Sequence, residues 1–178
     1  TSKAIYEMGK QGATVIQTGE SFDFLIKKLE LAPDLLDQLR EASRGTVDDM
    51  TLMSGTATLL AGVSDELGKK IGEATPRLME IAKAANKLNP ALGDTAFMYQ
   101  SIATGVKRAQ PLILDNLGLT IKVGDANEEM AKSLGKSVEQ LTAEEKAMAI
   151  LNATLEAGDV MIDQVGGSVD AATDSYAQ

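Results

Sequence analysis

Two pairs of adjacent carboxylates have the residue types that could support acid–base chemistry. Asp48–Asp49 and Glu144–Glu145 each place two carboxyl groups next to one another along the chain. Glycoside hydrolases use two carboxyl groups, one of which has a raised pKa and acts as the acid. Both pairs, however, fall in the predicted first turn of a helix, where negative side chains are stabilised by the helix dipole. We therefore interpret them as helix-start residues rather than as a catalytic centre.

A third group of polar residues has the alternating spacing of a calcium-binding loop. Asp125, Asn127 and Glu129 are each separated by one residue, as the first ligands of such a loop are. The loop also requires glycine at its sixth position and glutamate at its twelfth, where this chain has Met130 and Lys136. We therefore expect Asp125 or Asn127 to cap a helix instead. The sequence predicts no metal site and no cofactor.

The segment RAQPLILDNLGL, residues 108–119, places a carboxylate and an amide inside an apolar run. Pro111 suits a helix start and Gly118 suits a left-handed stop, so the aliphatic residues between them are expected to fill a core. Asp115 and Asn116 can then hydrogen-bond backbone groups near the helix end, and a catalytic Asp115 is the alternative. The residues that define this predicted packing joint are Pro111, Leu114, Asp115, Asn116, Leu117 and Gly118.

The composition excludes several classes of site. The chain has 178 residues with no His and no Cys, which rules out disulfides, thiolate or imidazole metal sites, and Ser-His-Asp or Cys-His catalysis. A net charge of −9 disfavours binding to nucleic-acid phosphates. No apolar run approaches the roughly 18 residues that span a bilayer, and no signal peptide is expected. Because the chain begins Thr-Ser-Lys, we expect it to be an internal segment of a longer protein.

Apolar residues recur at spacings of three and four along most of the chain. This pattern predicts an all-α fold, a compact module of about six to eight helices. The longest helix is expected over residues 143–164, opened by a Thr-x-x-Glu capping box at Thr142. We expect Thr46 to cap another helix, and Gly62 to separate it from the next, whose cap is Ser64.

Three further features interrupt the helical pattern. Pro76 is expected either to open a helix or to kink one that continues. Gly135 is expected to end a short helix. The sequence Leu-Thr-Ile-Lys-Val over residues 119–123 alternates like a strand, but a single strand has no pairing partner. We therefore predict a short extended connector near residues 119–123.

We expect three segments along the chain. Residues 1–32 form an N-terminal helical segment that is loosely attached. Residues 33–165 form the globular helical module. Residues 166–178 form a frayed tail or linker, because they contain few large apolar side chains.

Three stretches resemble the tail length tape measure proteins of phages and prophages. They are LREASRGTVDDMTLM (Leu39–Met53), GVKRAQPLILDNLGL (Gly105–Leu119) and LGKSVEQLTAEEKAMAILNATLEAG (Leu134–Gly158). The second is the most specific, because it is similar to the family's pattern of a basic residue, a polar residue and then Pro-Leu-Ile-Leu-Asp-Asn-Leu-Gly. Their order and spacing agree, and the resemblance covers roughly residues 35–165.

The resemblance implies a structural protein that lies inside the growing tail tube, sets tail length and leaves ahead of the genome at infection. A helix rises about 1.5 Å per residue, so extended helical length scales with residue count. The implied partners are other copies of the chain, tail tube or tail tip proteins and tail assembly chaperones, without specific nucleic acid and with membrane contact only during infection. The implied locations are the virion tail and, during assembly, the host bacterial cytoplasm.

Two other functions remain open from the sequence. One is a membrane-active or host-interacting helical module, since the parent protein must help a genome cross the envelope. The helix over residues 143–164 has an apolar face suited to this role, but its polar face is acidic. The other is a muralytic enzyme that uses Asp115 or a glutamate pair. We expect no catalysis, because the segment carries no recognisable active site.

Overall fold

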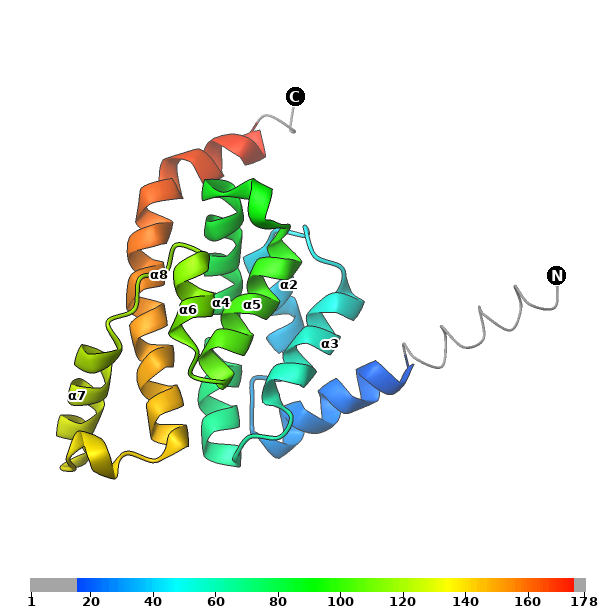
Figure 1. Ribbon diagram of the computed structural model, residues 1–178. Coiled ribbons are helices and arrows are strands. Elements are labelled where there is room, and N and C mark those ends of the chain that lie inside the picture. The colour runs from blue at the N-terminus through cyan, green and yellow to red at the C-terminus, as the bar shows by residue number, and fades with distance from the viewer. Residues whose placement is uncertain (1–15, 175–178) are drawn as a thin grey trace. The chain divides into compact units, whose positions relative to one another are not determined.

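A computed structural model describes the backbone of residues 16–174 and the side chains of residues 16–166 (Figure 1). Every regular element in that range is helical, which confirms the predicted all-α class. After a helix that includes residues 16–28, the elements are α2 (Leu35–Ser43), α3 (Asp49–Leu60), α4 (Asp65–Leu88), the 3₁₀ turn η1 (Pro90–Leu92), α5 (Thr95–Lys107), α6 (Pro111–Asn116), α7 (Val123–Leu134), the 3₁₀ turn η2 (Val138–Gln140) and α8 (Ala143–Asp174).

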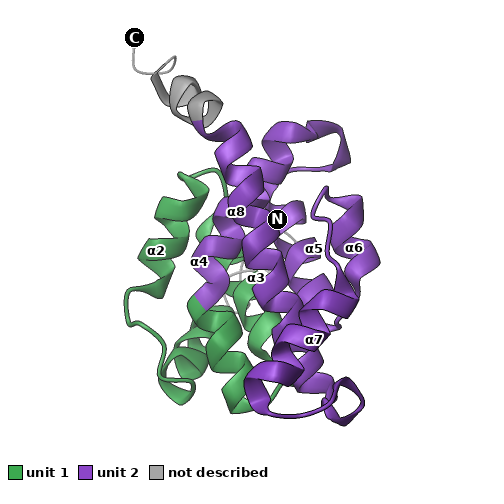
Figure 2. Ribbon diagram, turned by 90° about the vertical axis from the view of Figure 1, so that its left-hand side faces the viewer, with its two compact units in different colours: residues 1–73 green, residues 74–178 purple. Residues whose placement is uncertain are grey.

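The chain divides into two compact units between Glu73 and Ala74, a point inside α4 (Figure 2). The first unit contains α2, α3 and the first turns of α4, and α2 packs against α3. The second contains the remaining turns of α4 and the elements that follow, with α6 packed on α5 and α7 packed on α8. The segment boundaries after residues 32 and 165 remain predictions from the sequence.

The structure resolves the alternatives at Pro76 and gives the bounds of two other predicted elements. Pro76 lies inside α4, which continues on both sides of it. The predicted connector is non-helical over residues 119–122, and α7 begins at Val123. α8 runs to Asp174, ten residues beyond the predicted end at 164, and includes part of the predicted tail. The last residues of that predicted tail, 175–178, lie outside the described residues, as do the first fifteen of the predicted N-terminal segment.

Five helix ends in the described part of the chain share one backbone arrangement. Each has a residue in the left-handed region, and the amide that follows it donates to the carbonyl five residues earlier, over 2.8–3.1 Å. This is the Schellman arrangement, which satisfies carbonyls at a helix end and turns the chain back sharply. Its left-handed residues are Glu30, Arg44, Ala109, Gly118 and Gly135, with φ between 49° and 89°. Only the last two are glycines, and both were predicted as stops.

Side-chain oxygens cap the starts of α3, α4 and α8. Asp48, rather than the predicted Thr46, caps α3: its carboxylate accepts from the backbone N–H of Thr51 (2.9 Å) and from the Thr51 hydroxyl (2.7 Å). The Thr46 hydroxyl donates to a backbone carbonyl of α2 (2.6 Å). As predicted, Ser64 caps α4, where its hydroxyl accepts from the N–H of Leu67 (3.2 Å). Thr142 likewise caps α8, where its hydroxyl accepts from the N–H of Glu145 (3.2 Å). Local hydrogen bonding therefore fixes where these helices begin.

Close packing in the second unit depends on glycines that face aliphatic side chains. A Cβ on Gly158 of α8 would overlap Cδ1 and Cγ1 of Ile81 in α4, and a Cβ on Gly105 of α5 would lie 2.9 Å from Cδ2 of Leu114 in α6. Both Ile81 and Leu114 are fully buried. With six aromatic residues in 178, this chain builds its core from aliphatic side chains, and missing side chains let its helices approach one another closely.

We expect Gly158→Ala to destabilise the second unit. Ile81 is buried and β-branched, so it cannot rotate away from the new methyl group. Overpacking costs about 1–3 kcal/mol, against roughly 1 kcal/mol gained by alanine as a helix former. Urea unfolding followed by circular dichroism should show a net loss of up to about 2 kcal/mol. Gly166→Ala in the same helix is the control, since its Cβ meets no atom within 4 Å; it should stabilise. Equal effects of the two substitutions would contradict this packing.

The Asp48 cap should make α3 sensitive to acid. The hydroxyl of Thr51, followed by its backbone N–H, holds the pKa of Asp48 below its usual value of 3.8. The stabilisation is therefore present above that value and is lost as pH falls through the lower pKa of the folded protein. Asp48→Ala should cost about 1 kcal/mol at neutral pH, whereas Asp48→Asn should retain most of the cap and lose its acid dependence. Urea unfolding at a series of pH values checks both; identical pH profiles for wild type and Asp48→Asn would contradict the assignment.

Candidate functional site

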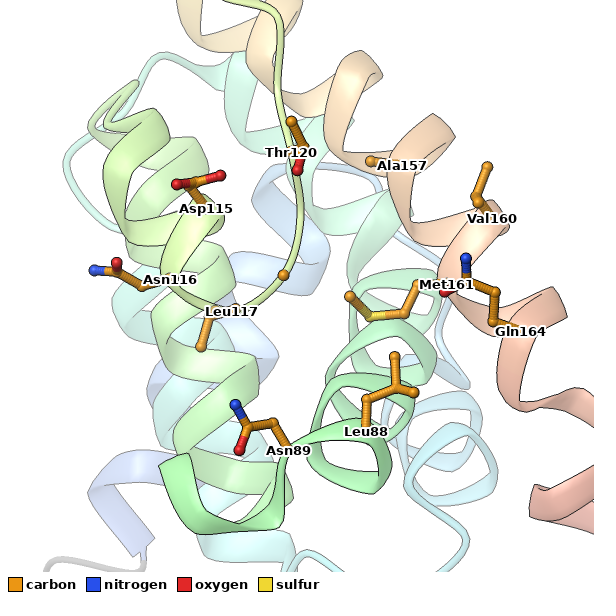
Figure 3. Close-up of a pocket in the computed structure, with 11 residues that line it drawn as sticks. Leu88, Asn89, Asp115, Asn116, Leu117, Thr120, Ala157, Val160, Met161 and Gln164 are labelled. Carbon is orange, nitrogen blue, oxygen red and sulfur yellow. The ribbon is translucent and has the colours of Figure 1, made fainter.

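A cleft of about 600 Å³ lies in the second unit, between the end of α4, the segment after α6 and residues 157–164 of α8 (Figure 3). This volume is in the range of small-ligand sites. Part of its wall is the predicted packing joint. The residues that line it are Leu88, Asn89, Asp115, Asn116, Leu117, Gly118, Thr120, Ala157, Val160, Met161 and Gln164.

Apolar side chains from three elements line the interior of this cleft. Leu88 extends into it from the end of α4, Leu117 from the end of α6 and Met161 from α8 (Figure 3). Leu117 and Met161 are buried, whereas Leu88 is 50% exposed and Val160 at the rim is 59% exposed. The cleft therefore presents some apolar surface to solvent.

The polar groups around the cleft suit hydrogen bonding better than acid–base chemistry. Asn89 and Gln164 contribute amides, Thr120 a hydroxyl and Asp115 the single carboxylate. The mechanism of glycoside hydrolases requires a second carboxyl group, and the lining of the cleft includes none. Among the described residues, no group of three or more Asp and Glu side chains is placed to hold a metal ion. The arrangement fits binding of an apolar group flanked by amides.

The packing joint that forms one wall is built by two successive Schellman ends. Ala109 ends α5 in the left-handed region, which allows Pro111 to open α6 as its first residue. At the end of α6, the N–H of Leu119 donates to the carbonyl of Leu114 (3.0 Å), and the N–H of Gly118 donates to the carbonyl of Asp115 (2.9 Å). Leu114 and Leu119 are both fully buried, as the hydrophobic contact of this motif requires.

The structure changes the predicted roles of three residues in this joint. Leu112 was expected in the core but is 77% exposed, because a helix of six residues turns only one side inward. The hydrogen bonds that close α6 use the backbone carbonyls of Leu114 and Asp115, so the helix stops without capping by the Asp115 or Asn116 side chain. In Figure 3 the Asn116 side chain points away from α8.

Both carboxylate pairs are used as helix starts and ion pairs. Asp49 follows the Asp48 cap and accepts from the Arg40 guanidinium (2.8 and 2.6 Å), which lowers its pKa. Glu145 in the first turn of α8 accepts from Lys136 (2.6 Å), and this bond likewise lowers its pKa. A general acid needs a raised pKa, so these shifts have the wrong sign for that role.

The calcium-like spacing belongs to a helix. Asp125, Asn127 and Glu129 all lie in α7, where alternate positions point in different directions. The prediction that Asp125 or Asn127 caps a helix was wrong: Lys122 occupies the cap position of α7, and Asp125 sits in the first turn. The Asn127 Oδ1 is buried without a hydrogen-bond partner among the described residues, a local cost to stability.

The sequence did not reveal the cleft. Neither Leu88 nor Asn89 was identified from the sequence as a site residue. Gln164 and Val160 were not singled out. One available signal was the apolar Val160 between the acidic residues Asp159 and Asp163, although apolar residues on a long helix are usually core.

Comparison of the chain with protein-family models, with curated proteins and with solved structures gave no match. Within the described residues, none of the helices combines the length and hydrophobicity required to cross a bilayer.

The two left-handed residues of the joint should respond oppositely to substitution. Alanine at a left-handed position costs about 1–2 kcal/mol, so Gly118→Ala, at φ 89°, should destabilise the protein by about 1 kcal/mol once the lower entropy of its unfolded chain is included. Ala109→Gly, at φ 49°, should stabilise by less than about 1 kcal/mol for the same reason. Thermal unfolding of both variants measures this. A destabilised Ala109→Gly variant would contradict the shared backbone geometry.

Proposed function

We propose that this chain is a structural and interaction module of a phage or prophage tail tape measure protein. It acts by protein–protein packing rather than by catalysis, and it contributes to tail assembly, to tail length and to genome delivery. The observation that carries the proposal is that Gly105–Leu119, the segment with the most specific resemblance, forms a packed joint. Its proline opens a helix, its glycine closes that helix and its buried leucines pack the joint.

The cleft next to this joint supports an interaction role. Its exposed apolar residues, Leu88 and Val160, and its flanking amides suit contact with another protein surface. The proposed partners are other copies of the chain, tail tube or tail tip proteins and tail assembly chaperones. The proposed locations are the virion tail and, during assembly, the host bacterial cytoplasm.

Tail length in assembled particles tests the ruler function. In a phage or prophage whose tail protein carries this segment, in-frame deletions in extended helical parts of that protein should shorten the tail by about 1.5 Å per residue. Deleting this segment should shorten the tail by less per residue, because its helices fold back on one another. Tail lengths are measured by electron microscopy of purified virions. The length-neutral substitution Asp115→Ala is the control and should leave tail length unchanged.

Three outcomes would contradict the proposal. Unchanged tail length in every deletion would exclude the ruler function. Clearing of cell-wall material in a zymogram, abolished by Asp115→Ala, would favour a muralytic enzyme. Flotation of the purified chain with anionic liposomes would favour a membrane-active module.

A further inference from the structure

The first turns of α4 are fixed within the first unit. A Cβ on Gly72 would lie 2.6 Å from Cδ1 of Leu31, and a Cβ on Gly68 would lie 3.2 Å from Cδ1 of Leu29. Both leucines are buried. An ion pair joins Lys69 to Glu30 across the same contact (3.7 Å). Because the packing is so close, we expect this part of α4 to move together with the segment that precedes α2.

The last turns of α4 are fixed within the second unit. Ile81 fills the space left by Gly158 in α8. One turn earlier, Arg77 donates to Asp159 of α8 through its Nε (3.0 Å) and Nη2 (2.5 Å). The carboxylates of Asp159 and Glu80 together raise the pKa of Arg77, Glu80 having the larger effect. We therefore expect this part of α4 to move together with α8.

Pro76 lies between these two fixed parts, three residues after the last residue of the first unit. A proline inside a helix has no N–H to donate to the backbone carbonyl four residues earlier, and its ring presses against the preceding turn. The backbone ladder of α4 therefore lacks one N–H donor close to the junction of the units. Sharp bends in helices occur at such positions.

We propose that Pro76 makes α4 a hinge, so that the two units move as separate bodies about this point of the helix. Each half of α4 stays with its own unit because of its close glycine contacts and ion pairs. The inference concerns a conformational device in the fold and does not depend on the proposed tail function.

Distances between spin labels test the hinge directly, because the chain contains no Cys to compete for labelling. Exposed residues are replaced in pairs: Glu41→Cys with Glu128→Cys reports across the units, Glu41→Cys with Lys70→Cys within the first, and Glu128→Cys with Asp163→Cys within the second. We expect the cross-unit pair to give the broader distance distribution. Pro76→Ala restores the missing N–H and should narrow that distribution to the width of the within-unit pairs.

Pro90→Ala is the matched control. Pro90 is exposed and opens η1, outside α4, so its substitution should leave the cross-unit distribution unchanged. A cross-unit distribution as narrow as the within-unit ones in the unsubstituted chain would overturn the hinge. A distribution that stays broad in Pro76→Ala, or that narrows equally in Pro90→Ala, would overturn the assignment to Pro76.

Hydrogen exchange gives a second measurement that does not depend on a variant. In the unsubstituted protein, amides over residues 73–80 should exchange faster than amides on either side of them in α4, because bending opens the ladder there. Uniform exchange along α4 would overturn the proposal. In Pro76→Ala, exchange over residues 73–80 should slow to the rate of the neighbouring turns.

Discussion

This arrangement of short helices depends on one backbone feature, a residue in the left-handed conformation at the end of a helix. A single such residue reverses the chain while the carbonyls at the helix end remain hydrogen-bonded. The chain uses it at Arg44, at Ala109 and again at Gly118. Short helices are marginal by themselves, so α2 and α6 gain stability only when the chain returns at once and packs them against a neighbour. Where a residue other than glycine holds this conformation, the packing it permits offsets the local strain.

The packing joint and the cleft follow from this constraint. The stop at Gly118 buries Leu119 against Leu114 and directs the connector past α8. The leucine at the end of α4 and the methionine of α8 face the space that this turn leaves open (Figure 3). Asp48 serves as a cap, and Asp49 and Glu145 are ion-pair partners, where their charged forms are stabilised.

Glycines allow close packing of helices in both units, with different glycines in each. Gly68 and Gly72 serve packing in the first unit, and Gly105 and Gly158 serve it in the second. Between these groups α4 contains its proline. The close packing of glycines against aliphatic side chains therefore also fixes each half of α4 to different neighbours. The proposed hinge depends on that difference.

The sequence by itself determined the features that depend on hydrogen bonds within a few residues and on apolar spacing. These features are the all-α class, the break at Gly62, the stops at Gly118 and Gly135 and the caps at Ser64 and Thr142. Only the tertiary structure decided which apolar side chains are buried. Leu112 and Leu88 belong to apolar patterns yet are exposed, because burial depends on which distant helix comes to cover a residue. It also decided that Ala109 adopts a left-handed conformation and that Leu88, Leu117 and Met161 line one cleft. No local pattern encodes these outcomes, since their energies come from contacts between residues far apart along the chain.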